Sequence, residues 1–121
     1  MTLGIGELVY MERGKGKTTQ MIAEILAEQQ ALSSSGDSEH RIMVSVLHKS
    51  EAARVLRLLR EAGAELYNIK FVTHKELQGA LRGVSATSVY IDEFTEIPRD
   101  SHEALDRAIE AGRIGVKGWY S

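Results

Sequence analysis

Glycine, lysine and threonine residues gather between a short apolar run and a helix-forming stretch. A loop that binds nucleotide phosphates needs backbone amides aimed at phosphate oxygens, a lysine ammonium between the terminal phosphates, a hydroxyl for Mg²⁺ and a helix N-terminus behind the group. Gly14, Gly16, Lys17 and Thr18 fit those needs in order. The residues that we predict to contact the nucleotide are Arg13, Gly14, Lys15, Gly16, Lys17, Thr18 and Thr19.

The phosphate-loop pattern is incomplete in this chain. Its full form is a glycine, four residues of any type and then Gly-Lys-Ser/Thr, and Met11 stands in the place of the first glycine. A bare Gly-Lys-Thr also arises by chance, so a lysine-rich surface turn is the alternative interpretation. The flanking sequence favours the phosphate loop, because residues 7–10 are strand-like and residues 18–30 are helix-like.

Two adjacent carboxylates, Asp92 and Glu93, end the β-rich apolar run 88–91. At the C-terminal end of a buried parallel strand, Asp92 can hold Mg²⁺ through water, and Glu93 can polarise an attacking water molecule. The alternative is a pair of solvated acids in a strand-to-loop turn. The upstream glycine-lysine loop favours the catalytic interpretation, because the two motifs occur in the order that such a site requires.

The two motifs together resemble those of P-loop NTPases, in the division with an additional strand and a catalytic glutamate after the Walker B aspartate. The resemblance covers nearly the whole chain and is greatest to the first ATPase core of helicase-like motors and of phage large-terminase packaging ATPases. In those families the first Walker A glycine is often missing, and an arginine can sit inside the loop, as Arg13 does here. The resemblance implies ATP and Mg²⁺ as cofactors, with Lys17 and Glu93 catalytic and with Thr18 and Asp92 organising the metal.

The expected fold is an α/β three-layer sandwich, with a parallel sheet of about five strands and helices on both faces (a RecA-like core). Apolar runs alternate with amphipathic ones, which predicts strand, helix, strand, helix throughout one domain, 1–121. The strands are expected near 7–11, 42–47, 69–72, 88–92 and 113–117, and the helices near 17–31, 50–62, 74–82 and 101–111. Small polar residues predict a mobile loop at about 33–40.

Local patterns predict several helix ends. Thr73 with Glu76, and Asp100 with Glu103, have the spacing of capping boxes at the start of the third and fourth helices. Gly63 and Gly112 suit left-handed C-terminal caps.

The segment 113–121 is expected to form the strand between the loop strand and the Walker B strand. In the resembling families the end of this strand carries a polar residue that senses the terminal phosphate, a position that suits Lys117 or Ser121 here. Trp119 and Tyr120 either pack in the core, close the sheet edge, cover the base or meet a partner.

Two strand-to-helix junctions carry histidine and lysine, at His48 and Lys49 and again at His74 and Lys75. In the resembling families both junctions can touch the nucleic-acid backbone, which makes DNA or a DNA-processing protein a candidate partner. The alternative is that these residues only cap helices and face solvent.

Arginines recur at spacing three in the helix 50–62, at Arg54, Arg57 and Arg60, and form either a basic patch or a solvated helix face. The four histidines, which have no metal-ligand spacing and are expected at the surface or at caps, are His40, His48, His74 and His102.

Composition limits the remaining possibilities. The chain has 121 residues, 43% of them hydrophobic, and no apolar run long enough to cross a bilayer, so we expect no membrane partner and a cytoplasmic location, in the host if the gene is phage-encoded. The absence of cysteine excludes disulfides and thiolate metal sites. A formal net charge of -2 argues against a protein that binds nucleic acid non-specifically over its whole surface.

A minimal core of this kind is expected to lack the arginine that a second domain or subunit brings to the terminal phosphate. A homo-oligomer or an arginine-donating partner would then support fast turnover, and the candidate donors in trans are Arg13, Arg99, Arg107 and Arg113. Three functions remain open. They are an ATP hydrolase, a nucleotide-gated binding or regulatory module with negligible hydrolysis, and a small nucleoside or nucleotide kinase, which would also need an acceptor pocket and an arginine-bearing lid.

Overall fold

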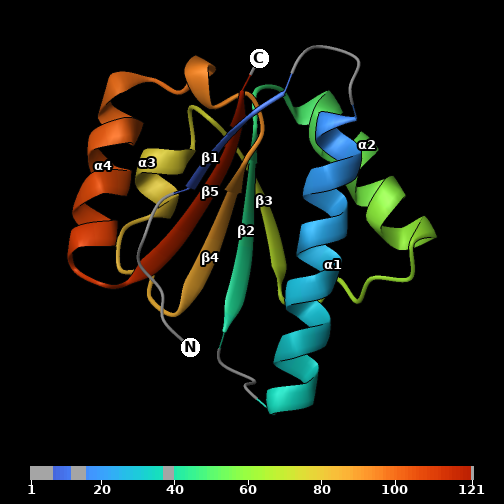
Figure 1. Ribbon diagram of the computed structural model, residues 1–121. Coiled ribbons are helices and arrows are strands. Elements are labelled where there is room, and N and C mark those ends of the chain that lie inside the picture. The colour runs from blue at the N-terminus through green and yellow to red at the C-terminus, as the bar shows by residue number, and fades with distance from the viewer. Residues whose placement is uncertain (1–6, 12–15, 37–39, 121) are drawn as a thin grey trace.

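The computed structural model describes residues 7–11, 16–36 and 40–120, in which five parallel strands form one sheet (Figure 1). Along the sheet the strand order is β1-β5-β4-β2-β3. The strands are β1 (Glu7–Tyr10), β2 (Arg41–Val46), β3 (Ile69–Thr73), β4 (Thr87–Ile91) and β5 (Ile114–Tyr120). All neighbouring strands are parallel, so their C-terminal ends share one edge of the sheet.

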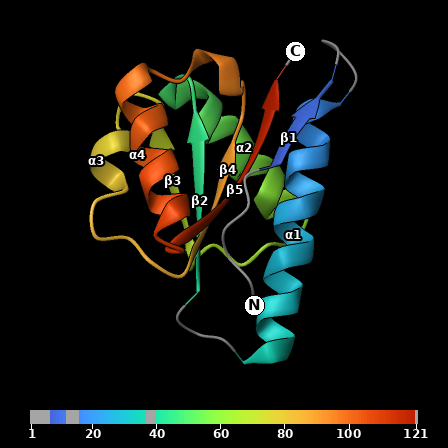
Figure 2. The same ribbon diagram turned by 60° about the vertical axis from the view of Figure 1, so that its left-hand side comes forward.

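Helices cover both faces of this sheet. The helices are α1 (Lys17–Ser35), α2 (Lys49–Glu61), α3 (Leu77–Ala80) and α4 (Arg99–Glu110), with a 3₁₀ turn, η1 (Phe94–Glu96). Figures 1 and 2 show α1 and α2 on one face and α3 and α4 on the other. The predicted three-layer α/β sandwich is therefore confirmed. No helix in the described part of the chain is both long enough and apolar enough to cross a membrane.

Strand β5 lies between β1 and β4, as the resemblance to P-loop NTPases implied. Val9 of β1 is opposite Trp119, and Val89 of β4 is opposite Val116. The strand that leads to the glycine-lysine loop and the strand that leads to Asp92 are thus separated by one strand.

The core has two layers because alternate residues of each buried strand point to opposite faces. On the α1–α2 side, Ile42, Val44 and Val46 of β2 pack with apolar residues of both helices. On the α3–α4 side, Val89 and Ile91 of β4 pack with apolar residues of α3, α4 and β5. Both faces of the central strands are buried, which explains their near-continuous apolar sequence.

The first helix is longer than predicted. Serines 33–35, expected in a mobile loop, form the last turn of α1, and Gly36 ends the helix with φ +74° and ψ +14°. The buried side chain of Leu32 holds this last turn against the core, which outweighs the modest helix propensity of serine. Residues 37–39 of the predicted loop lie outside the described residues, and His40 after them is buried.

The later helices also differ from the prediction. Only 77–80 of the expected 74–82 form α3, although Glu76 accepts hydrogen bonds from the N–H and the hydroxyl of Thr73, at 2.9 and 3.0 Å. The predicted cap at Asp100 is wrong, because Pro98 is the N-cap and α4 begins at Arg99. The 3₁₀ turn η1 was not predicted. The predicted left-handed glycines after α2 and α4 are confirmed, at Gly63 and Gly112.

Candidate functional site

The described members of the two predicted motifs lie at the C-terminal edge of the sheet. Gly16 is the N-cap of α1 and has φ +82°, and Lys17 and Thr18 begin the helix. Asp92 and Glu93 follow directly after β4. Thr19 is exposed in the first turn of α1. Predicted nucleotide contacts that fall outside the described residues are Arg13, Gly14 and Lys15.

Lys17 and Glu93 form an ion pair across this edge. Lys17 begins α1 and Glu93 follows the end of β4, so the contact joins two segments that are far apart in the sequence. Both side chains are mostly shielded from solvent, with exposed fractions of 13% for Lys17 and 30% for Glu93. The fold therefore brings the two predicted catalytic residues into direct contact.

The backbone at Glu93 is in the left-handed region, at φ +53° and ψ +63°. A residue with a Cβ adopts this conformation at a cost of about 1–2 kcal/mol, and such strain is concentrated at functional sites. The carbonyl of Glu93 accepts the N–H of Glu96 at 2.9 Å, which starts the η1 turn. The turn directs the Glu93 carboxylate back towards α1 instead of onward with β4.

Asp92 is buried, with 5% of its surface exposed, and its Oδ1 atom accepts no hydrogen bond from any described residue. Its N–H donates to the carbonyl of Ser45 at 3.1 Å, which holds the end of β4 against β2. A buried acceptor without a partner costs about 1–3 kcal/mol. Oxygen ligands and retained waters are what Mg²⁺ prefers, so the Asp92 carboxylate and the Thr18 hydroxyl fit the predicted metal.

Thr18 has a partner that the sequence did not indicate. Its Oγ1 atom accepts a hydrogen bond from Nη2 of Arg54, in α2, at 3.1 Å. The sequence offered Arg54, Arg57 and Arg60 as either a basic patch or a solvated face. Arg57 fits the solvated face, because it is exposed and faces Glu61 one turn later at 4.0 Å. The two arginines one turn apart thus have different roles.

His74 lies behind Asp92 and is not the surface or cap histidine that was predicted. It is 1% exposed, and its Nδ1 atom is 2.7 Å from the hydroxyl of Ser45, the residue that also binds the Asp92 N–H. Burial lowers the pKa of His74, which favours the neutral ring. Ser101 donates to the His74 carbonyl at 3.1 Å and fixes the segment to α4.

Of the other three histidines, one is buried and two are exposed. His40 was also predicted at the surface and is buried, with Nε2 2.8 Å from Ser88 Oγ and 3.2 Å from a Glu28 carboxylate oxygen. His48 and His102 are exposed, as predicted.

The predicted candidate for a phosphate sensor in β5, Lys117, contacts α1. Its ammonium pairs with Glu24 of α1 and lies 5.6 Å from the ring centroid of Trp119. Trp119 is fully buried, and its ring stacks on Tyr90 with the ring centroids 6.1 Å apart. Its indole N–H donates to Gln20 at 3.1 Å. Of the roles considered for Trp119, packing in the core is therefore the one observed. Ser121 lies outside the described residues.

One predicted arginine donor is committed to its own chain. Arg113 donates from Nη1 to the carbonyls of Leu81 and Val84, at 3.2 and 2.7 Å, and so closes the segment after α3. Arg99 is 91% exposed and lies 3.4 Å from Glu103. Arg113 is therefore a structural residue, whereas Arg99 faces solvent.

A hollow of about 350 Å³ joins the two strand-to-helix junctions at the same sheet edge. Its lining residues are Leu47, His48, Lys49, Thr73, His74, Lys75, Glu96 and Pro98. His48, Lys49 and Lys75 are exposed there, so the fold brings the predicted junction residues around one concave surface.

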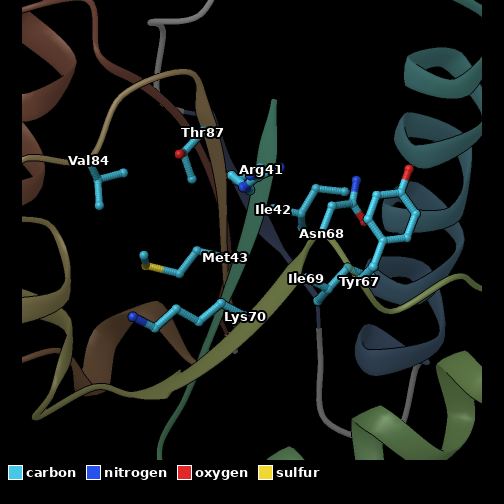
Figure 3. A pocket seen from close by; sticks show the side chains of 9 residues that line it. All are labelled: Arg41, Ile42, Met43, Tyr67, Asn68, Ile69, Lys70, Val84 and Thr87. Atoms are coloured by element: carbon cyan, nitrogen blue, oxygen red, sulfur yellow. The ribbon is translucent and has the colours of Figure 1, made fainter. Parts of the chain in front are cut away.

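A second hollow, of about 280 Å³, lies at the opposite edge, where β2, β3 and β4 begin (Figure 3). Arg41, Lys70 and the exposed Tyr67 belong to its lining, together with apolar residues such as Met43. None of the predicted site residues lines it. The described residues of the predicted phosphate loop and of the acidic motif therefore lie at the C-terminal edge, away from this second hollow.

No protein family and no curated protein matches the chain's sequence. Among solved structures, the fold is similar to that of arterivirus nonstructural protein 10, a helicase in complex with DNA, with a TM-score of 0.59 and 18% sequence identity. The similarity covers 96% of this chain and 28% of the helicase chain. The chain thus has the fold of a helicase domain and spans less than a third of the helicase it resembles.

Proposed function

We propose that the chain is a P-loop NTPase core that binds ATP with Mg²⁺ and hydrolyses it. The ion pair between Lys17 and Glu93 is the observation that supports this most, because it joins the predicted phosphate-binding lysine to the predicted general base. The buried Asp92 precedes Glu93, and one of its carboxylate oxygens has no hydrogen-bond partner among the described residues, which supports the same assignment. The helicase-like fold is in keeping with it.

Each residue has a distinct role in the proposed reaction. Lys17 would leave the Glu93 carboxylate and pair with the terminal phosphates, because the carboxylate and the phosphates are both anions that an ammonium binds. Glu93, once released, would accept a proton from the attacking water. Thr18 and Asp92 would hold Mg²⁺, which supplies neutralisation of the phosphate charge.

We propose that DNA contacts the concave surface between the β2–α2 and β3–α3 junctions. Lys49, Lys75 and His48 are exposed there and could contact phosphate oxygens, and the similar helicase was solved with DNA. Glu96 in the same lining disfavours dense phosphate packing, so the contact would be local. A second copy or another protein that donates an arginine would raise the hydrolysis rate, by about 10³–10⁵ in related chemistry.

The test is steady-state phosphate release from Mg²⁺–ATP, with and without single-stranded DNA, by the wild-type chain and two lysine variants. Lys17→Ala removes the proposed phosphate contact, and Lys70→Ala is its control, because Lys70 is exposed and lies at the opposite edge. We expect release by the wild type and by Lys70→Ala, stimulation by DNA, and loss in Lys17→Ala.

Other outcomes would change the proposal. Equal release by all three proteins would overturn it. Binding of ATP without release, in the absence and presence of DNA, would make the chain a nucleotide-gated module. Transfer of labelled phosphate to an added nucleoside or nucleotide would make it a kinase.

A further inference from the structure

Arg54 reaches from α2 to the start of α1, where it donates a hydrogen bond from Nη2 to the Thr18 hydroxyl at 3.1 Å. Thr18 directly follows Lys17, whose ammonium takes part in the central ion pair. The guanidinium of Arg54 therefore lies next to the two residues that begin α1. The site thus has a second cation from the same chain.

The contact between Arg54 and Thr18 conflicts with a metal ion at the same hydroxyl. A divalent ion needs an oxygen lone pair of Thr18, and it would repel a guanidinium that donates to the same atom. Arg54 must then leave Thr18 when the metal and nucleotide bind. A bound phosphate chain would offer it a new partner, because phosphate oxygens match the fixed donor fork of a guanidinium.

We propose that Arg54 moves from Thr18 to the terminal phosphate of a bound nucleoside triphosphate and makes the site prefer triphosphate over diphosphate. This inference depends on the proposed nucleotide site. It assigns to the chain's own α2 helix a cation that was otherwise expected from a partner or a second copy. A diphosphate lacks the anion that Arg54 would bind, which is the source of the preference.

Calorimetric titration with Mg²⁺–ATP and Mg²⁺–ADP tests this directly, with the wild type, Arg54→Ala, Arg54→Lys and Arg57→Ala. Arg54→Ala is expected to weaken ATP binding by about tenfold or more, the usual effect of a hydrogen bond to a charged group, and to leave ADP binding within about twofold. Arg54→Lys keeps the charge without the fork and should recover part of the loss. Arg57→Ala should match the wild type, because Arg57 faces Glu61 one turn further along α2.

The outcomes separate this inference from the proposed function. If Lys17→Ala loses ATP binding while Arg54→Ala binds ATP like the wild type, the nucleotide site stands and the role of Arg54 is refuted. An equal loss for ATP and ADP would also refute it, because Arg54 would then support the site without sensing the terminal phosphate. Arg54 is exposed, so the urea midpoints of all variants should agree and exclude misfolding as the cause.

Discussion

Replacing Glu93 with glutamine should make the chain bind ATP more tightly while it hydrolyses ATP more slowly. Glu93 forms an ion pair with Lys17, so a phosphate chain that binds Lys17 must displace a carboxylate. Glutamine has nearly the same shape and removes only the charge. The variant therefore releases Lys17 for phosphate and also removes an anion that would repel it.

The expected change in ATP affinity follows from the solvent exposure of the ion pair between Lys17 and Glu93. Two unit charges at contact distance attract by about 4 kcal/mol at an effective dielectric constant near 20. Solvent screening and lost side-chain freedom leave a net value of about 1 kcal/mol, since Glu93 is still 30% exposed. One kcal/mol corresponds to about a fivefold lower Kd for ATP. Loss of the general base should slow phosphate release by about 10²–10⁴.

Calorimetric titration with Mg²⁺–ATP and a phosphate-release assay measure the two effects separately. Glu96→Gln is the control, because it makes the same charge change three residues later at an exposed position. We expect wild-type behaviour from the control. Unchanged or weaker ATP binding by Glu93→Gln would show that nucleotide does not displace this ion pair, and unchanged release would show that Glu93 is not the base.

Three further predictions concern stability. Trp119→Ala should lower the free energy of unfolding by about 3–5 kcal/mol, measured by urea denaturation, because it removes a fully buried side chain; a loss below about 1 kcal/mol would contradict this packing. Gly36→Ala should lower the free energy of unfolding by about 1–2 kcal/mol, because Gly36 has a φ of +74° that alanine adopts only with strain. Gly79→Ala inside α3 should leave this free energy unchanged or raise it by up to about 1 kcal/mol. Equal effects of the two substitutions would show that the left-handed backbone at Gly36 does not matter. Hydrogen bonds from Thr73 hold the pKa of Glu76 below 4.5. Glu76→Ala should therefore lower the urea midpoint at pH 7, and the difference from wild type should vanish as the pH falls from about 4.5 through the lowered pKa.

The site motifs could be predicted because their chemistry is local in sequence. Lys17 follows a glycine and opens a helix, and Glu93 follows an aspartate at a strand end. The order of strands and helices could be predicted from apolar periodicity alone. The resemblance to P-loop NTPases added that β5 lies between β1 and β4, which no local pattern shows.

The missed features depend on contacts between distant segments. Spacing placed Arg54 on a helix face, but only the packing of α2 beside α1 brings its guanidinium to Thr18. His74 precedes an exposed lysine in the sequence, yet it is buried, and its Nδ1 atom lies within hydrogen-bond distance of Ser45 from β2. Glu24 of α1 likewise pairs with Lys117 of β5, a contact between residues far apart in the sequence.

We propose that Lys17 binds nucleotide phosphate at the C-terminal edge of the sheet. This binding is measured by calorimetric titration of Mg²⁺–ATP into the wild type, Lys17→Ala and the control Lys70→Ala. The predicted result is saturable binding by the wild type and by Lys70→Ala, and a loss of affinity of at least about tenfold in Lys17→Ala. Equal ATP affinity in all three proteins would contradict the claim.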